Sequence, residues 1–130
     1  MDLKKVETEG APAAIGPYSQ GISVGDFIFC SGQIGLNPKT SQFATDDVQG
    51  QTQQAIHNLG AVLQEAGSDL AHVVKTTVFL TDMANFKEMN DVYESIFSEV
   101  TQVQPARSTV AVRSLPRGAL VEIEAIAVKR

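Results

Sequence analysis

The residue most suited to a binding or catalytic role is Arg107, in the segment Pro105-Ala106-Arg107-Ser108-Thr109-Val110. Pro105 cannot donate a backbone hydrogen bond, and it biases the residue before it toward extended backbone, so a strand is predicted to begin here. A guanidinium beside two hydroxyl side chains can hold a carboxylate through two parallel hydrogen bonds. The alternative is a structural ion pair between Arg107 and one of the fifteen acidic residues.

A second candidate for chemistry is a pair of glutamates in the apolar stretch 120–128. Glu122 and Glu124 share a face with Leu120, Ile126 and Val128 if this stretch is a strand. Apolar surroundings disfavour the charged form of a carboxylate, which can make it a usable general base. The alternative is that one glutamate pairs with an arginine, Arg107 or Arg113, while the other is solvated.

Two strands joined by Gly25-Asp26 are predicted upstream, because a two-residue Gly-Asp turn between alternating segments is typical of a hairpin. The turn fixes the register, and all paired side chains are then expected on one face. That face is apolar near the turn and polar at its open end, which indicates either a site at a sheet edge or a sheet that ends in solvent. The predicted pairs are Val24 with Phe27, Ile22 with Phe29, Gln20 with Ser31, and Tyr18 with Gln33.

Two helices are predicted from apolar residues at helical spacing. The first begins near Val48, with Thr45 or Asp46 as its cap, and ends before Gly67. The second follows Thr81-Asp82, and Asn90 is the polar member of its apolar stripe. Because a buried amide needs partners, Asn90 is expected either to bind backbone or to face a pocket. The stripe comprises Met83, Phe86, Met89, Asn90, Tyr93, Ile96 and Phe97.

With a further β-branched strand over 71–80, the predicted order is β-β-helix-β-helix-β-β. This order indicates one α+β domain over residues 1–130, with both helices on one face of the sheet. If the last two strands are neighbours, Arg107, Thr109, Glu122 and Glu124 share a face; a third strand between them is the alternative. The other sheet face is also apolar in the last strand, so a second copy of the chain is its expected cover.

Composition excludes several classes of protein. The chain has 130 residues, 43% hydrophobic residues and a net charge of −5, so it lacks the broad basic field of a nucleic-acid-binding protein. A small local basic patch is left open, formed by Lys129 and Arg130 with Arg113 and Arg117. No Gly-rich phosphate loop, metal-ligand spacing or Ser-His-Asp order is found.

The single cysteine, Cys30, lies in the apolar run Phe27-Ile28-Phe29-Cys30 and is interpreted as a core residue. One cysteine permits no internal disulfide, which fits a reducing compartment. The N-terminal residues form no apolar signal region, and no run reaches the length of a membrane span. These features predict a cytoplasmic protein.

Five segments together resemble the RidA (YjgF/YER057c/UK114) family over nearly the whole chain. They are Gly16-Pro17-Tyr18-Ser19-Gln20, Ser31-Gly32-Gln33-Ile34-Gly35, Asn90, Pro105-Ala106-Arg107-Ser108 and Ile123-Glu124-Ala125-Ile126-Ala127. The resemblance implies a chorismate-mutase-like α+β fold and a homotrimer with a site in each cleft between subunits. It also implies hydrolysis of reactive enamines and imines, such as 2-aminoacrylate and 2-iminobutyrate, to 2-keto acids and ammonia.

The resemblance further implies that no cofactor is needed and that pyridoxal-phosphate dehydratases supply the substrate. Arg107 matches the arginine that binds the substrate carboxylate, and Glu122 matches the glutamate associated with the attacking water. Thr109 stands where the family often has cysteine, which argues against an essential thiol. The alternatives are a translation inhibitor or endoribonuclease and a regulatory, small-molecule-sensing module. Other residues matching the cleft lining are Tyr18, Ser31, Gly32 and Asn90.

Overall fold

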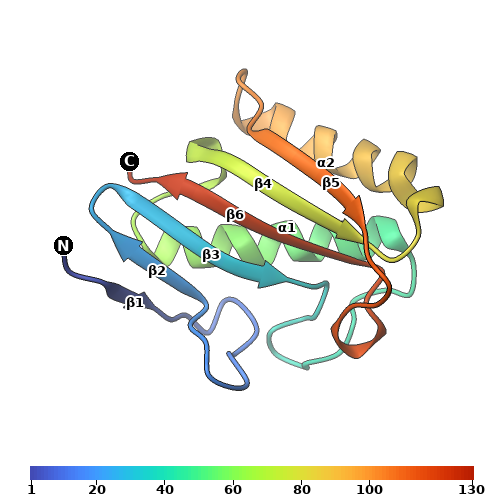
Figure 1. Ribbon diagram of the computed structural model, residues 1–130, viewed down its shortest axis with the longest axis horizontal. Helices are drawn as coiled ribbons and strands as arrows, with labels where there is room; N and C mark the ends of the chain where they lie inside the picture. Colours follow the sequence, from blue (N-terminus) through green and yellow to red (C-terminus); the bar gives the residue numbers. More distant parts are fainter.

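The computed structural model describes residues 1–130 and contains one six-stranded mixed sheet (Figure 1). The strands lie in the order β1-β2-β3-β6-β4-β5, and every neighbouring pair is antiparallel except β4–β5. The predicted α+β class is therefore confirmed. The strand bounds are β1 Lys4–Val6, β2 Gly21–Val24, β3 Phe27–Gln33, β4 Val73–Leu80, β5 Ala106–Ala111 and β6 Val121–Val128.

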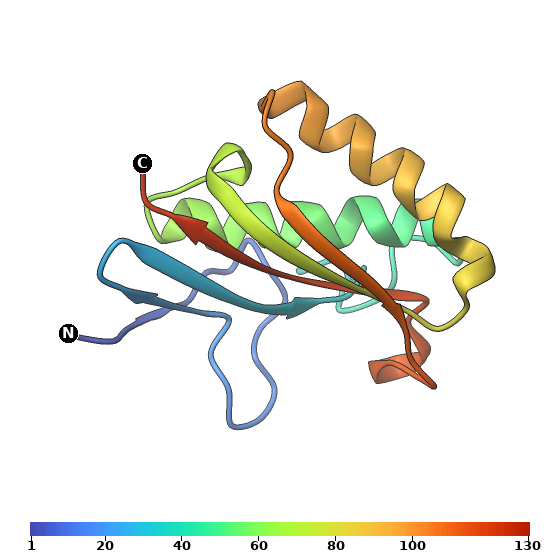
Figure 2. The same ribbon diagram turned by 45° about the horizontal axis from the view of Figure 1, so that its top comes forward.

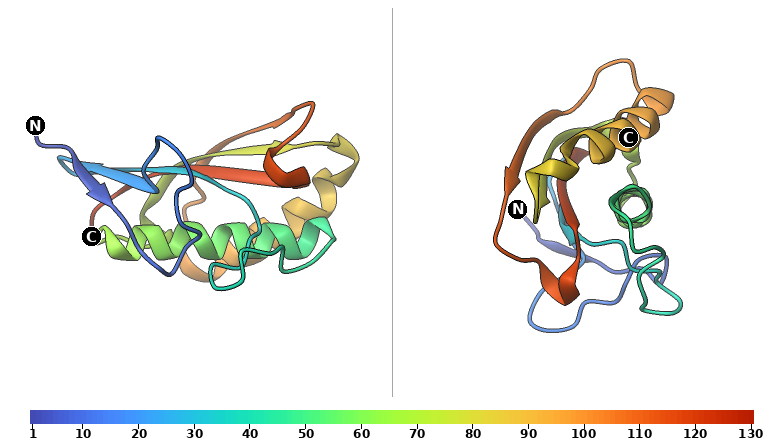
Figure 3. Two further views of the ribbon diagram at one scale, coloured as in Figure 1. Left: turned by 90° about the horizontal axis from the view of Figure 1, so that it is seen from below. Right: turned by 90° about the vertical axis from the view of Figure 1, so that its right-hand side faces the viewer.

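Both helices lie against one face of this sheet, as predicted (Figure 3). Helix α1 spans Val48–Glu65 and helix α2 spans Phe86–Val100. Their apolar stripes pack against the buried side chains of β3, β4 and β6, because each strand alternates buried and exposed residues. Short 3₁₀ turns at Leu70–His72, Met83–Asn85 and Pro116–Gly118 complete the secondary structure.

The helix ends follow the predicted chemistry with one correction. The cap of α1 is Asp47, not Thr45 or Asp46, because only the residue directly before Val48 reaches the first turn, where its Oδ1 accepts from Gly50 N at 2.7 Å. Gly67 follows the helix with φ of +85°, a conformation that glycine adopts without strain. Asp82 caps the 3₁₀ turn that leads into α2, accepting from Ala84 N at 2.9 Å.

The hairpin register is correct near the turn, where Ile22 pairs with Phe29 and Val24 pairs with Phe27. At the open end the prediction is confirmed in part: Ser31 N donates to Gln20 O at 2.9 Å, as expected of that pair, whereas the pairing of Tyr18 with Gln33 is wrong. A bulge at Ser31-Gly32 shifts the register, so Gln33 pairs with Ile123 and is buried on the helix side of the sheet. Because a bulge inserts one extra residue, it reverses the alternation that the prediction had extended.

The apolar half of the predicted hairpin face does not form the core of the chain. Phe27 and Phe29 remain 47% and 44% exposed, whereas Ile28 and Cys30 between and beside them are buried against the helices. Burial raises the pKa of the Cys30 thiol to about 12, so Cys30 is a core residue, as interpreted from the sequence. Phe27 and Phe29 thus belong to the sheet face that no helix covers.

That uncovered face, called here the outer face, carries several exposed apolar side chains. Val110 on β5 and Val74 on β4 are each 41% exposed there. Figure 3 shows that the helices lie on the opposite side and that no other segment covers the sheet. An exposed apolar face of this kind is typical of a surface that contacts another protein.

Strand β4 lies between β5 and β6, so the two site-bearing strands are not direct neighbours. Thr76 pairs with Arg107 on one side of β4, and Phe79 pairs with Glu122 on the other. Thr76 is fully buried toward the helices, whereas Phe79 alternates with the buried residues of β4 and faces outward. Arg107 and Glu122 therefore lie on opposite faces, and the expectation of a shared face is wrong.

The possible basic patch is also absent from the fold. Arg113 and Arg117 precede β6, whereas Lys129 and Arg130 follow it, at opposite ends of an extended strand (Figure 1). Eight residues of strand separate the two groups by about 26 Å. Neither helix combines the length and the apolar composition needed to cross a bilayer.

Candidate active site

Arg107 lies on the helix side of β5 against three side chains of α2. Its Nη1 donates a hydrogen bond to Asn90 Oδ1 at 2.8 Å. Its Cζ lies 4.7 Å from the ring centroid of Tyr93 and 5.6 Å from that of Phe86, within the range of cation–π attraction. No acidic side chain forms an ion pair with Arg107, so the interpretation of a structural ion pair is wrong.

A cavity of about 240 Å³ opens beside the guanidinium. Asn90 faces this cavity and makes no hydrogen bond to backbone, so the second of the two expectations for this residue is confirmed. The wall contains one acidic group, Glu94, and one further amide, Gln104. The complete lining is Asn90, Tyr93, Glu94, Gln104, Pro105 and Arg107.

Glu122 lies on the outer face, directly over the backbone of Gly32. A Cβ atom on Gly32 would lie 2.8 Å from Glu122 Cδ, so a larger residue at this position would displace the carboxylate. Glu122 has no ion pair and no hydrogen-bond partner in the chain. Desolvation raises the pKa of Glu122, and the nearby charge of Glu124 raises it further.

The interpretation that one glutamate pairs with Arg107 or Arg113 is therefore wrong, and the expectation of a desolvated carboxylate is confirmed. Glu124 is exposed on the same strand. An unpaired carboxylate with a raised pKa is the usual state of a general base that works near neutral pH.

The remaining predicted residues have different surroundings. Ser31 is part of the bulge beside Gly32, and its hydroxyl donates to the Ser19 carbonyl. Tyr18 is 52% exposed in the loop before β2 and contacts neither Arg107 nor Glu122 through a hydrogen bond. Thr109 Oγ1 is buried and has no hydrogen-bond partner, and Thr109 does not line the cavity beside Arg107.

The chain thus forms two separate groups of predicted residues. The first, called here the arginine group, contains Arg107 and Asn90 on the helix side. The second, called here the glutamate group, contains Ser31, Gly32 and Glu122 on the outer face. Strand β4 separates them by two strand spacings, about 9.6 Å in the plane of the sheet, and they project from opposite faces.

Three residues that surround the arginine group were not identified as site residues from the sequence. Tyr93 and Phe86 were interpreted as core residues, because both belong to the apolar stripe of α2. Glu94 follows Tyr93 and carried no distinguishing pattern. The spacing in the sequence could have identified Phe86 and Tyr93. They lie four residues before and three residues after Asn90, and therefore on the same helix face as this site candidate.

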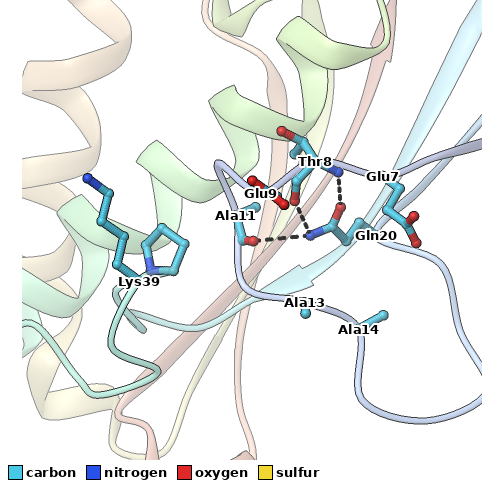
Figure 4. A pocket seen from close by; sticks show the side chains of 9 residues that line it. Glu7, Thr8, Glu9, Ala11, Ala13, Ala14, Gln20 and Lys39 are labelled. Carbon is cyan, nitrogen blue, oxygen red and sulfur yellow. Dashed lines mark hydrogen bonds between the residues drawn. The ribbon is translucent and has the colours of Figure 1, made fainter.

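A larger hollow of about 620 Å³ lies between the N-terminal segment and Pro38-Lys39 (Figure 4). Its buried polar residue, Gln20, accepts from Thr8 N and donates to backbone carbonyls of the same segment. Gln20 is thereby occupied in attaching residues 8–12 to the sheet. This hollow lacks an arginine, and its unpaired charged side chains, Glu9 and Lys39, are exposed to solvent, so the cavity beside Arg107 is the better candidate. No three His, Cys, Asp or Glu side chains lie close enough to share a metal ion.

Comparison with known proteins gives consistent matches over almost the whole chain. The family model described as Endoribonuclease L-PSP matches residues 8–129. The 2-iminobutanoate/2-iminopropanoate deaminase of Escherichia coli (strain K12) is 47% identical over 127 residues, which cover 98% of each chain. The crystal structure of the E. coli YjgF gene product superposes with a TM-score of 0.94 at 47% identity, covering 98% of this chain and 99% of that chain. E. coli TdcF, crystallised with bound serine, superposes with a TM-score of 0.93 at 42% identity and covers the same shares of the two chains.

Proposed function

Because this chain belongs to the RidA (YjgF) family, whose matching model is described as Endoribonuclease L-PSP, we propose that it is an enzyme that hydrolyses 2-imino acids. The substrates are 2-iminobutanoate and 2-iminopropanoate, together with their enamine tautomers, and the products are 2-keto acids and ammonia. Pyridoxal-phosphate dehydratases supply these imines in the proposal. The relative with 47% identity carries the name of this activity.

The observation that carries the proposal is the state of Arg107. Its guanidinium is held in place by a neutral amide and an aromatic ring, beside a cavity and without an acidic partner. A structural arginine pairs its charge, whereas a ligand-binding arginine keeps donors free for an anion. Bound serine in TdcF supports a small carboxylate-bearing ligand in this fold.

In the proposed reaction, Arg107 binds the substrate carboxylate through two parallel hydrogen bonds and thereby fixes the position of the imine carbon. Water adds to that carbon while Glu122 accepts one of its protons and passes it to the imine nitrogen, which gives the amino alcohol C(OH)–NH2. Glu122 then accepts the hydroxyl proton and passes it to the same nitrogen, so that the C–N bond breaks, NH3 leaves and the C=O bond of the 2-keto acid forms. The raised pKa of Glu122 suits both proton transfers.

The smaller groups are assigned to orientation of the substrate. Gly32 brings its backbone beside Glu122, whereas Ser31, whose hydroxyl and amide donate to the carbonyls of Ser19 and Gln20, holds the bulge in position. Asn90 holds Arg107, and Tyr18 and Thr109 contact the substrate in the assembled protein. For Thr109, the support is a buried hydroxyl that has no partner within one chain.

One chain cannot place Arg107 and Glu122 on the same imine, because they project from opposite faces of the sheet. We therefore propose a homotrimer in which the arginine group of one subunit meets the glutamate group of the next. The exposed apolar side chains of the outer face, Phe27, Phe29 and Val110 among them, form the contact between subunits. A site between subunits also explains why the hydroxyl of Tyr18, in an exposed loop, has no hydrogen-bond partner within its own chain.

The activity is tested by release of 2-oxobutanoate from threonine by threonine dehydratase, with and without this protein. The wild type is expected to accelerate the step. Arg107→Ala is expected to reduce kcat/KM by about 10²- to 10³-fold, the cost of losing a desolvated ionic contact. Arg113→Ala is the matched control, because Arg113 is exposed and lies on the same chain segment. Equal activity of the two variants would contradict the role of Arg107.

The composite site is tested by co-expressing Arg107→Ala with Glu122→Gln, each inactive alone. If the two groups come from neighbouring subunits, random mixing in a trimer restores both groups at about a quarter of the interfaces, and about a quarter of the activity returns. If both groups acted from the same subunit, no mixed protein could combine them. Absence of recovered activity in verified mixed trimers would therefore exclude the composite site.

The ribonuclease and regulatory alternatives have no specific support in this molecule. The net charge is −5, and the basic residues that could have formed a patch lie at opposite ends of β6. An assay of RNA cleavage by the purified protein, with Arg107→Ala beside the wild type, tests the ribonuclease alternative. Binding of a 2-keto acid without imine hydrolysis would favour the regulatory alternative.

A further inference from the structure

Tyr93 connects the arginine group to the centre of the sheet. Its ring lies 4.7 Å from Arg107 Cζ, and its hydroxyl shares a 2.7 Å hydrogen bond with Thr76 Oγ1. Both partners of that bond are buried, with Tyr93 4% and Thr76 0% exposed. The other side of the ring packs on Phe97, with ring centroids 4.6 Å apart.

The strand register explains why these contacts coincide. Thr76 on β4 and Arg107 on β5 are paired residues of a parallel ladder, so their side chains project side by side from the same face. Tyr93, on α2 above them, spans both: its hydroxyl binds Thr76 while its ring faces the guanidinium. The tyrosine is therefore fixed at its hydroxyl and along its ring.

Arg107 is restrained by the Tyr93 ring at 4.7 Å, by the more distant Phe86 ring at 5.6 Å and by a single hydrogen bond. Only Nη1 has a hydrogen-bond partner in the chain, namely Asn90 Oδ1, so Nη2 and Nε are free to donate. A long side chain with several rotatable bonds loses much conformational freedom on binding, and restraint before binding reduces that cost. An aromatic ring restrains a guanidinium without consuming its donors.

We propose that Tyr93 is a positioning residue: anchored by Thr76, its ring fixes the plane of the Arg107 guanidinium so that the free donors meet the substrate carboxylate. This inference rests on the proposed function and names a residue outside the predicted site. Tyr93 does not contact the reacting atoms and acts only through Arg107.

The test compares four variants in the threonine dehydratase assay, with the imine level set by the amount of dehydratase. Tyr93→Leu removes the ring and is expected to raise KM about tenfold, while kcat stays within about twofold of the wild type. Tyr93→Phe and Thr76→Val each remove one side of the anchoring bond and are expected to raise KM about threefold. The double variant Tyr93→Phe/Thr76→Val is expected to equal either single variant, because both changes remove the same bond.

A second measurement reports the position of Arg107 without using activity. In the wild type, the Arg107 side-chain NH resonances in an NMR spectrum are expected to carry a ring-current shift from Tyr93. Tyr93→Phe retains that shift in a broadened signal, and Tyr93→Leu abolishes it. Met89→Ala is the control for loosening of α2, because Met89 is fully buried on the same helix outside the arginine group. It is expected to lower Tm without changing KM.

Three results would overturn the inference: an unchanged KM in Tyr93→Leu, a fall in kcat alone, or an equal rise in KM in Met89→Ala. If Tyr93→Leu does not fold, the same decision rests on Tyr93→Phe and Thr76→Val. A failure of the proposed function would give a different result: the wild type would not accelerate imine hydrolysis, or Arg107→Ala would be as active as the wild type. An active wild type, an inactive Arg107→Ala and a fully active Tyr93→Leu would refute only the role of Tyr93.

Discussion

The arginine group and the glutamate group provide opposite environments for their charged side chains. Arg107 is supported on several sides, by the Asn90 amide and the rings of Tyr93 and Phe86. Glu122 is half-buried over the backbone of Gly32 and has no partner, with a second carboxylate nearby. The first environment fixes a charge in position, and the second makes a charge unfavourable.

This difference matches the two tasks. A group that binds an anion must stay charged and point in one direction, and neutral contacts achieve this without neutralising it. A group that exchanges protons works best when its pKa lies near the working pH, and desolvation moves a carboxylate in that direction. Exchanging the two environments would produce a neutralised arginine and an ordinary surface glutamate, and neither would serve the proposed reaction.

The largest effect that separates the two groups is expected from Glu122→Gln. Loss of the general base should reduce kcat by about 10²- to 10⁴-fold, while the affinity for the product 2-oxobutanoate changes little. For Arg107→Ala the affinity is expected to fall with the rate. Rate measurements at saturating imine, together with calorimetric titration of 2-oxobutanoate, check the distinction. A Glu122→Gln variant that lost affinity and kept its kcat would invert the two assignments.

The same variant should not lose stability, which excludes unfolding as the cause of its inactivity. The pKa of Glu122 is raised in the folded state, so its protonated form favours folding and its charged form opposes it. The wild type therefore loses this contribution as pH rises through the folded-state pKa. Glu122→Gln is expected to melt above the wild type at neutral pH, and the difference should shrink as pH falls.

A smaller effect is expected from Glu124→Gln on the pH dependence of the reaction. Glu122 must be deprotonated to accept a proton from water, so its raised pKa places the acidic limb of the kcat profile above the range of an ordinary glutamate. Glu124→Gln removes the neighbouring negative charge and should shift that limb to lower pH. Glu88→Gln, a change on an exposed carboxylate of α2, is the matched control. An unshifted profile in Glu124→Gln would refute the coupling between the two glutamates.

The smallest effect concerns the orphaned hydroxyl of Thr109 beside the arginine group. Thr109→Val removes a buried polar atom without a partner and keeps the shape of the side chain. Because the hydroxyl is proposed to contact the substrate, KM is expected to rise about threefold in the imine-hydrolysis assay. An unchanged KM, together with a gain in stability of about 1 kcal/mol by chemical denaturation, would contradict that contact.

Local features of the fold were predictable because they depend on neighbours in the chain. The Gly25-Asp26 turn fixed the pairing of Val24 with Phe27, and the spacing of apolar residues located both helices. The bulge at Ser31-Gly32 was missed, although a glycine inside a strand indicates a bulge or a close approach of another group, and Gly32 here provides both. The position of β4 between β5 and β6 was open, since several strand orders satisfy the same pattern.

The candidate site was predicted residue by residue but not in its arrangement. Arg107, Glu122 and Asn90 were identified as candidates from their residue types and surroundings in the sequence, and their roles were implied by the family resemblance. The structure shows Arg107 bound to Asn90 without an acidic partner, and a raised pKa for Glu122. Tyr93 was missed because an aromatic residue on an apolar helix stripe has the same pattern whether it supports the core or an arginine. Only its distance to Arg107 distinguishes the two.

The sequence alone determined which elements form and which side chains are candidates for chemistry, because helix and strand periods and residue types are local properties. The tertiary structure decided which face each side chain occupies and which strands are neighbours. Those depend on a bulge and on strand order, where a shift of one residue moves a side chain through the sheet. For that reason the separation of Arg107 from Glu122, and with it the need for a second subunit in the proposed site, emerged only from the fold.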